Sequence, residues 1–186
     1  SPEQLHYTYD LNHGTIVQAW RGRFLDATPM WYNRGNGTAR PLGAVQHLSG
    51  LGLTVAPLSS AGSSWKSDTS GTSFTPKGYL MDTDNQPTFR YLVDGVMVHD
   101  MIRVADEGKG LRREISAQQP AERLYVRLAE GSSIEAMEDG MYAVDGKSYY
   151  LRLENASAVQ ASVLEANGKQ QLVAPLQDKL DYSILF

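Results

Sequence analysis

The chain of 186 residues contains no cysteine. This absence excludes disulfide bonds, thiolate metal sites, cysteine nucleophiles and covalently attached haem within the chain. No apolar run approaches the roughly 20 residues of a membrane-spanning helix, and no signal-peptide pattern opens the chain. The start at Ser1-Pro2, without methionine, suggests a processed or excised product.

Signatures of catalytic and metal sites are also missing. There is no G-x-S-x-G nucleophile elbow, and Gly50-Leu51-Gly52 lacks the third glycine of a phosphate loop. Asp82-Thr83-Asp84-Asn85 begins like a calcium loop, but the glycine at position six and the glutamate at position twelve are absent, which favours a hairpin turn. No histidine pair has the i, i+2 or i+4 spacing of two ligands on one face, although the four could still converge in space; these are His6, His13, His47 and His99. We therefore expect no metal site and no cofactor in this chain.

The charge balance carries little information about partners. Lys and Arg number 17 against 21 Asp and Glu, which gives a net charge of −4. No basic cluster compensates, so the sequence excludes the electrostatic footprint of a nucleic-acid-binding protein. A chain of this length can bury roughly 70% of its unfolded surface, and one domain over residues 1–186 is the simplest organisation.

The sequence does contain a strong β pattern. Leu5–Leu11 and Pro87–Val93 alternate apolar and polar residues, as half-buried strands do. Asp94-Gly95, Asp145-Gly146 and Asn167-Gly168 each separate two β-prone runs, and such pairs favour type I′ hairpin turns. With no convincing amphipathic helix, the pattern predicts an all-β antiparallel sandwich.

Ser59–Gly78 differs sharply in composition from its surroundings. It is mostly Ser, Thr and Gly, with Trp65 and Phe74 as isolated rings. A connection of this length predicts a long loop or flap within the domain, and the two rings indicate that part of it docks on something.

Aromatic rings and guanidinium groups are concentrated in Ala19–Trp31 and its continuation Tyr32–Gly43. Rings beside arginines and a carboxylate suit a polar or ring-shaped ligand, or an ordered protein contact. The alternative is a strand pair in which Trp20 and Trp31 are core and only Trp65 is exposed. The candidate ligand-binding residues are Trp20, Arg21, Asp26, Trp31, Tyr32, Arg34, Arg40 and Trp65.

Carboxylate pairs offer an enzymatic alternative. Glycoside hydrolysis needs two carboxylates across a groove. The candidates for catalysis are Asp10 or Asp26, paired with a carboxylate of Tyr79–Asp106. The sequence does not show which acids face each other.

A set of short motifs resembles a poorly characterised bacterial extracytoplasmic β-domain, and the likeness spans nearly the whole chain. The motifs are Tyr9-Asp10, Ala19-Trp20-Arg21-Gly22, Phe24-Leu25-Asp26, Met30-Trp31, Arg34-Gly35, Pro41-Leu42-Gly43, Gly78-Tyr79, Pro87-Thr88-Phe89-Arg90-Tyr91, Gly95-Val96, Leu111-Arg112-Arg113 and Tyr182-Ser183-Ile184. That domain is found in large secreted or periplasmic proteins that also carry c-type cytochrome or sugar-dehydrogenase-like (quinoprotein) domains. The resemblance implies an extracytoplasmic location and an accessory role, and it carries over no catalytic residues.

We therefore expect a non-catalytic binding or docking module of an extracytoplasmic redox or carbohydrate-active multidomain protein. The expected partners are a carbohydrate or small ring ligand, or cytochrome or dehydrogenase domains of the same polypeptide or complex. The alternatives are a carbohydrate-active enzyme with a carboxylate pair and a structural spacer. An exposed ring platform would favour binding, two facing carboxylates in a groove would favour the enzyme, and a fully packed aromatic stretch would favour the spacer.

Overall fold

The computed structural model describes residues 3–31, 37–48, 50, 52–66, 68–105, 108–119 and 122–186. Nearly all of its regular structure is β. The strands are β1 (Leu5–Asp10), β2 (Thr15–Asp26), β3 (Arg40–His47), β4 (Val55–Pro57), β5 (Thr75–Met81), β6 (Pro87–Val93), β7 (Val96–Ala105), β8 (Gly110–Ala117), β9 (Leu124–Gly131), β10 (Ile134–Ala136), β11 (Met141–Val144), β12 (Tyr149–Leu153), β13 (Ser162–Ala166), β14 (Lys169–Pro175) and β15 (Lys179–Leu185). A single helical turn, α1 (Thr28–Trp31), and a 3-10 turn, η2 (Glu138–Gly140), complete the described elements.

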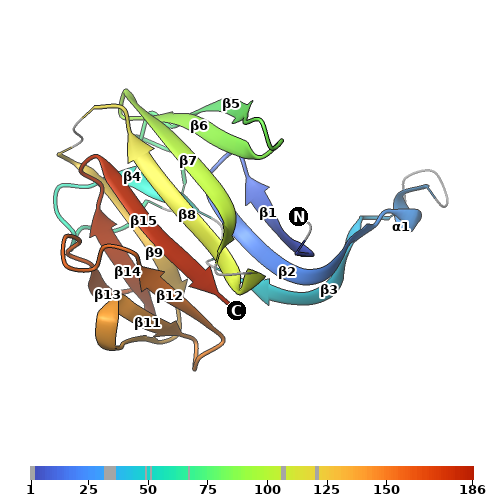
Figure 1. Cartoon of the computed structure of the whole chain (residues 1–186). Coiled ribbons are helices and arrows are strands. Elements are labelled where there is room, and N and C mark those ends of the chain that lie inside the picture. The colour runs from blue at the N-terminus through green and yellow to red at the C-terminus, as the bar shows by residue number, and fades with distance from the viewer. Residues whose placement is uncertain are drawn as a thin grey trace.

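The strands form three antiparallel sheets that pack as a sandwich (Figure 1). The largest has the order β10-β11-β12-β15-β8-β7-β6-β5. A three-stranded sheet, β1-β2-β3, and a four-stranded sheet, β13-β14-β9-β4, supply the opposing layer. The predicted all-β antiparallel sandwich is thus confirmed.

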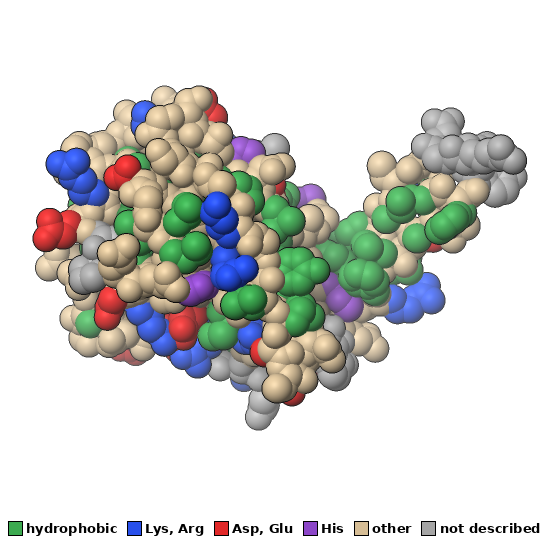
Figure 2. Space-filling view, turned by 90° about the horizontal axis from the view of Figure 1, so that it is seen from above, with side chains coloured by type: hydrophobic (Ala, Val, Ile, Leu, Met, Phe, Trp, Pro, Cys, Tyr) green, Lys and Arg blue, Asp and Glu red, His purple; other side chains and the backbone are tan. Residues whose placement is uncertain are grey.

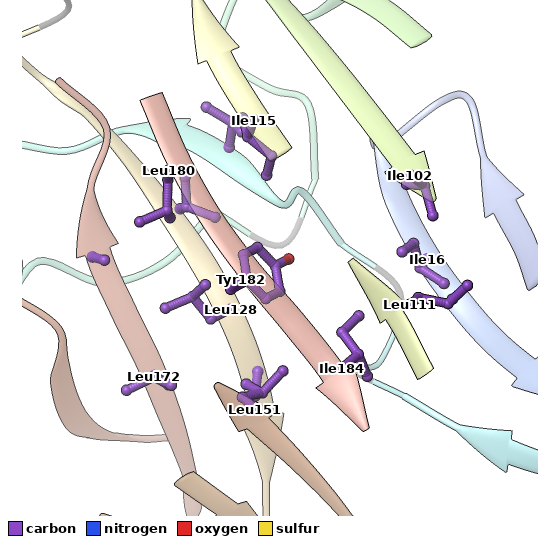
Figure 3. Packing of buried hydrophobic residues seen from close by; sticks show 14 of the residues in the cluster. Ile16, Ile102, Leu111, Ile115, Leu128, Leu151, Leu172, Leu180, Tyr182 and Ile184 are labelled. Atoms are coloured by element: carbon purple, nitrogen blue, oxygen red, sulfur yellow. The ribbon is translucent and has the colours of Figure 1, made fainter. Parts of the chain in front are cut away.

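Residues from all three sheets contribute to one hydrophobic core (Figure 3). Along β6, Phe89, Tyr91 and Val93 point inward, as the alternation of the sequence predicts. Leu172 and Leu128 of the four-stranded sheet pack in the same cluster as Leu180, Tyr182 and Ile184 of β15, and Ile16 of β2 lies near Ile102 and Leu111. These contacts join the three sheets.

The hairpin predictions hold because the turn residues accept positive φ angles. Asp94 and Gly95 join β6 to β7 with φ angles of 50° and 78°, and Asn167 and Gly168 join β13 to β14 with 53° and 75°. Asp145-Gly146 also connects two paired strands, β11 and β12. The predicted turn at Asp82 is present as well, since its carboxylate accepts the backbone N–H groups of Asp84 (3.0 Å) and Gln86 (2.8 Å) between β5 and β6.

The loop predicted at Ser59–Gly78 is shorter than expected, because β5 already begins at Thr75, and Thr75 and Pro76 pair with β6. The described part of residues 58–74 contains no helix or strand. Both of its rings dock on the body. Phe74 packs near the Tyr91 ring at 5.1 Å between centroids, and the Trp65 indole N–H donates to the Leu53 carbonyl at 2.8 Å.

A buried ion pair lies between the two layers. The Arg113 guanidinium of β8 donates to both carboxylate oxygens of Asp100 of β7, at 2.9 and 2.5 Å, and both side chains are almost fully buried. The Tyr9 hydroxyl of β1 donates to the same carboxylate at 2.7 Å. Arg113 also donates to the Gly14 carbonyl at 2.7 Å and to the Tyr182 hydroxyl at 3.2 Å. This network fastens the β1–β2 hairpin to the large sheet.

Replacing Asp100 by Asn should destabilise the fold strongly. The change leaves the Arg113 charge buried without its counter-ion, which typically costs about 3–5 kcal/mol. Urea denaturation monitored by circular dichroism measures the loss. The matched control is Arg112→Ala, which removes the exposed partner of Asp181 and should cost only about 0–1 kcal/mol. Equal losses in the two variants would show that the buried network contributes no more to stability than an exposed ion pair.

Because four tyrosines are buried or half-buried, we expect the folded state to lose stability at alkaline pH. Burial, followed by the charge of Asp100, raises the pKa of Tyr7 from 10.0 to about 12. Burial also raises the pKa values of Tyr9, Tyr91 and Tyr182. Because the folded-state values exceed the unfolded ones, the neutral phenols contribute stability that is fully present below about pH 10. The free energy of unfolding should then fall as the pH rises towards 12, whereas a constant value over this range would contradict the burial of these hydroxyls.

Candidate functional site

The distal part of the β2–β3 hairpin extends away from the sandwich, and we call its described residues, 22–31 with α1 and 37–43, the arm (Figure 1). Figure 2 shows it from another side as an extension beyond the body, with hydrophobic side chains along it and at its base. The arm coincides with most of the aromatic and arginine-rich stretch that the sequence singled out.

Two glycines allow the strands to approach closely where the arm leaves the sandwich. Gly22 and Gly43 face each other in the β2–β3 register, and Gly22 has a φ of 125° that other residues rarely adopt. A Cβ atom on Gly43 would lie 1.7 Å from the Arg21 carbonyl oxygen, and one on Gly22 would lie 2.6 Å from that of Leu42. A bulge follows between Arg23 and Leu25. Bulges bend and twist a strand, so the direction of the arm is set at this point.

Trp20 and Arg21 fix the base of the arm instead of lining an open surface. Trp20 is only 2% exposed, and its indole N–H is shared between the carbonyls of Arg23 (3.1 Å) and Phe24 (3.0 Å). The Arg21 guanidinium donates to the Phe186 carbonyl at 2.8 Å and to the Gly108 carbonyl. Both were candidate ligand-binding residues, but their polar groups are used in packing the arm onto the body.

The outer part of the arm has the opposite character. Trp31 is 84% exposed, Phe24 62% and Met30 48%. Trp31 and Asp26 line one open concave surface of about 670 Å³, together with Arg23 and Leu42. The structure thus brings together two of the residues that the sequence proposed for a binding surface.

Asp26 organises the turn at the tip of the arm. Its carboxylate accepts the backbone N–H of Thr28 at 2.9 Å, just where α1 begins. Hydrogen bonds from the side chain and then the backbone of Thr28 lower the pKa of Asp26, and the charges of Arg40 and Arg23 act in the same direction. Arg40 faces Asp26 across the β2–β3 register. The carboxylate is therefore ionised at neutral pH and available as an acceptor.

The remaining candidates are not all on the arm. Tyr32 and Arg34 lie outside the described residues. Trp65 packs on the body, where the Arg127 guanidinium carbon lies 5.8 Å from the centroid of its ring. Trp65 therefore contacts the opposing sheet and not the exposed rings of the arm.

The two acid candidates cannot act on one bond together. Asp10 pairs with Thr15 at the start of β2, whereas Asp26 is at the end of the same strand, roughly 35 Å of strand away. Catalytic carboxylates of glycosidases lie only about 5–10 Å apart. Asp10 is also held locally, since it accepts from the His13 ring at 2.6 Å and from the Asn12 backbone at 2.9 Å.

Two of the acids proposed as their partners are engaged as well. Asp100 is buried against Arg113, and Asp82 is paired with Arg103 at 2.7 Å. Asp106 lies outside the described residues. Among the described side chains, no group of three or more His, Asp or Glu residues could hold a metal ion.

A second hollow, missed by the sequence reasoning, lies at the base of the arm, and we call it the groove. It has a volume of about 590 Å³ and is formed by β1, the bulge of β2, the β5–β6 turn, β7 and β8. Leu5, Ile102 and Leu111 provide a buried apolar floor. Phe24 and Tyr7 provide rings on its walls. These residues come from segments up to about a hundred positions apart, so no local motif could have revealed them.

Comparisons of the chain with protein-family models, with curated proteins and with solved structures find no match. Across the described part of the chain, no helix has the length and apolar character needed to cross a membrane.

The two tryptophans of the stretch should respond differently to substitution. Trp31→Ala should change the free energy of unfolding by no more than about 0.5 kcal/mol, because the side chain is mostly solvated. Trp20→Ala should cost about 3–5 kcal/mol, because it removes a buried ring and leaves a cavity. Urea melts of both variants measure the difference. A loss of several kcal/mol for Trp31→Ala would mean that the ring is packed and the arm is not an exposed surface.

Proposed function

We propose that this chain is a non-catalytic docking module of an extracytoplasmic multidomain redox or carbohydrate-active protein. In this proposal the arm binds another domain of the same polypeptide or complex. The exposure of Trp31 on a projecting hairpin is the observation that carries it. The location and the kind of partner follow from the sequence resemblance.

The exposed apolar side chains of the arm are not explained by folding stability. A solvated tryptophan adds little to folding, yet Trp31, Phe24 and Met30 are all presented on the arm. Large aromatic residues and Met are enriched in protein interfaces, where burying a ring against a partner releases its hydration. Arg23 and Arg40 add guanidinium groups that can bind carboxylates of a partner. The arm therefore has the composition of an interface.

A ring-shaped ligand on the arm is the second candidate. Trp31 and Asp26 share the concave surface of the arm, so a sugar or quinone could stack on the indole and accept or donate hydrogen bonds at the rim. We place it second because that surface is wide and open, whereas small-molecule sites usually enclose most of their ligand.

The other two alternatives are supported less well. A carbohydrate-active enzyme would need Asp10 or Asp26 to face a free carboxylate of Tyr79–Asp106. In that region Asp82 and Asp100 are paired with arginines, and Asp10 itself accepts from His13 and Asn12. A spacer would need a fully packed aromatic stretch, and three of its large apolar residues are exposed.

The absence of cysteine permits a direct test of docking. Trp31→Cys would place the only thiol of this chain on the arm. We expect it to react with a maleimide at least about tenfold more slowly in the full-length protein than in the isolated domain, because a partner covers it. Mass spectrometry of the labelled peptide measures the rate.

The control is Met137→Cys, at an exposed position between β10 and η2, which should react equally in both contexts. Equal reactivity of position 31 in both contexts would contradict docking by the arm. Protection of the isolated domain by an added sugar or quinone would instead support the second candidate.

A further inference from the structure

The groove at the base of the arm has the size of a small-molecule site. Its volume of about 590 Å³ lies within the range of ligand pockets, and it is recessed between the two layers of the sandwich. The floor is apolar, with Leu5, Ile102 and Leu111 buried. A ligand here must therefore present an apolar face.

A solvated aromatic ring stands at the side of this floor. Phe24 occupies the bulge of β2 and is 62% exposed, and its ring lies 5.3 Å from that of His6. The His6 ring is fixed in turn by a 3.0 Å hydrogen bond between its Nε2 and the Gly22 carbonyl. The Trp20 ring also lies 6.3 Å from that of Phe24, and the large exposed part of the Phe24 ring leaves area free for a flat ligand to stack on.

Planar hydrogen-bonding groups surround the floor. Glu3 contributes a carboxylate, and the β5–β6 turn contributes the Asp84 carboxylate and the side-chain amides of Asn85 and Gln86. Tyr7, half-buried in the wall of the groove, adds a phenolic O–H donor. Such groups can engage neighbouring hydroxyls two at a time.

The charges of the groove select against anions. Arg103 is its one guanidinium within the described residues, and it already pairs with Asp82 and donates to the Pro87 carbonyl at 3.0 Å. Glu3 and Asp84 take part in no ion pair with any described residue, so the rim carries uncompensated negative charge. A phosphate or carboxylate would be repelled, whereas a neutral molecule with hydroxyl groups can use the rim groups as hydrogen-bond partners.

From these features we propose that the groove binds a neutral saccharide, with one sugar face against Phe24 and the apolar floor. The hydroxyls of the sugar bond to the rim formed by Glu3, Asp84, Asn85 and Gln86. This inference does not depend on docking by the arm, and it assigns to the chain a ligand site separate from Trp31.

Titrations of the whole chain with maltose, cellobiose and lactose, followed by backbone amide NMR, test the proposal. We expect at least one sugar to shift amide resonances of the groove, in β1, the β5–β6 turn and β7. Phe24→Ala should weaken this binding by about tenfold, and Gln86→Ala should weaken it severalfold. Both positions are at least partly solvated, and Phe24→Tyr, which keeps the ring, should retain binding.

Met137→Ala, at an exposed position between β10 and η2 that lines neither the groove nor the arm, is the matched control and should leave saccharide binding unchanged. Glucuronate, as an anion, and menadione, as an apolar quinone, should bind more weakly than the neutral sugar. The proposal is overturned if no sugar shifts groove resonances at millimolar concentrations, if Phe24→Ala binds as well as the unmodified chain, or if either comparison ligand binds more tightly.

Discussion

The buried ion pair between Asp100 and Arg113 is the constraint on which the layered arrangement depends. Two charges removed from water are tolerated only when each finds several partners, and here Tyr9, Gly14 and Tyr182 complete the network. Tyr9 and Gly14 belong to the β1–β2 hairpin, whereas Asp100 and Arg113 belong to the large sheet. An apolar contact would tolerate sliding, but directed hydrogen bonds fix the hairpin in one position. The arm and the groove both begin from that hairpin.

The base of the arm is also held in place by hydrogen bonds and close packing. The Arg21 guanidinium donates to the Phe186 carbonyl, and the Trp20 indole N–H donates to the Arg23 carbonyl at the bulge. The close approach of the glycines at 22 and 43 sets the direction of the hairpin. Beyond this point the side chains contribute little to folding. The bulge serves both proposals, because it directs Trp31 away from the body and exposes Phe24 over the groove. In the two proposals, the saccharide site and the docking surface therefore lie on either side of this bulge.

The local features of the fold could be predicted because local chemistry decides them. Asp94-Gly95 and Asn167-Gly168 form turns because both central residues tolerate positive φ. The alternation of apolar and polar residues along Pro87–Val93 indicates which face of that strand is buried. The segment with the high density of rings and arginines forms much of the β2–β3 hairpin and its arm. Leu42–Leu58 contains several glycines, and its apolar residues follow neither the period of a helix nor that of a strand. Its strands β3 and β4 form because partners elsewhere in the chain provide hydrogen bonds.

By itself, then, the sequence determined the fold class, the hairpins and the absence of cysteine chemistry, because these follow from the properties of neighbouring residues. Only the tertiary structure decided that Trp20 is buried and Trp31 exposed, although the two occur in one short stretch. Composition cannot distinguish them, since burial depends on which strands cover a side chain. The groove was likewise decided by packing: Leu5, Phe24, Gln86 and Ile102 meet only because three strands and the β5–β6 turn converge there. The distances between such segments depend on how the whole sandwich packs. The local sequence of one segment therefore does not predict them.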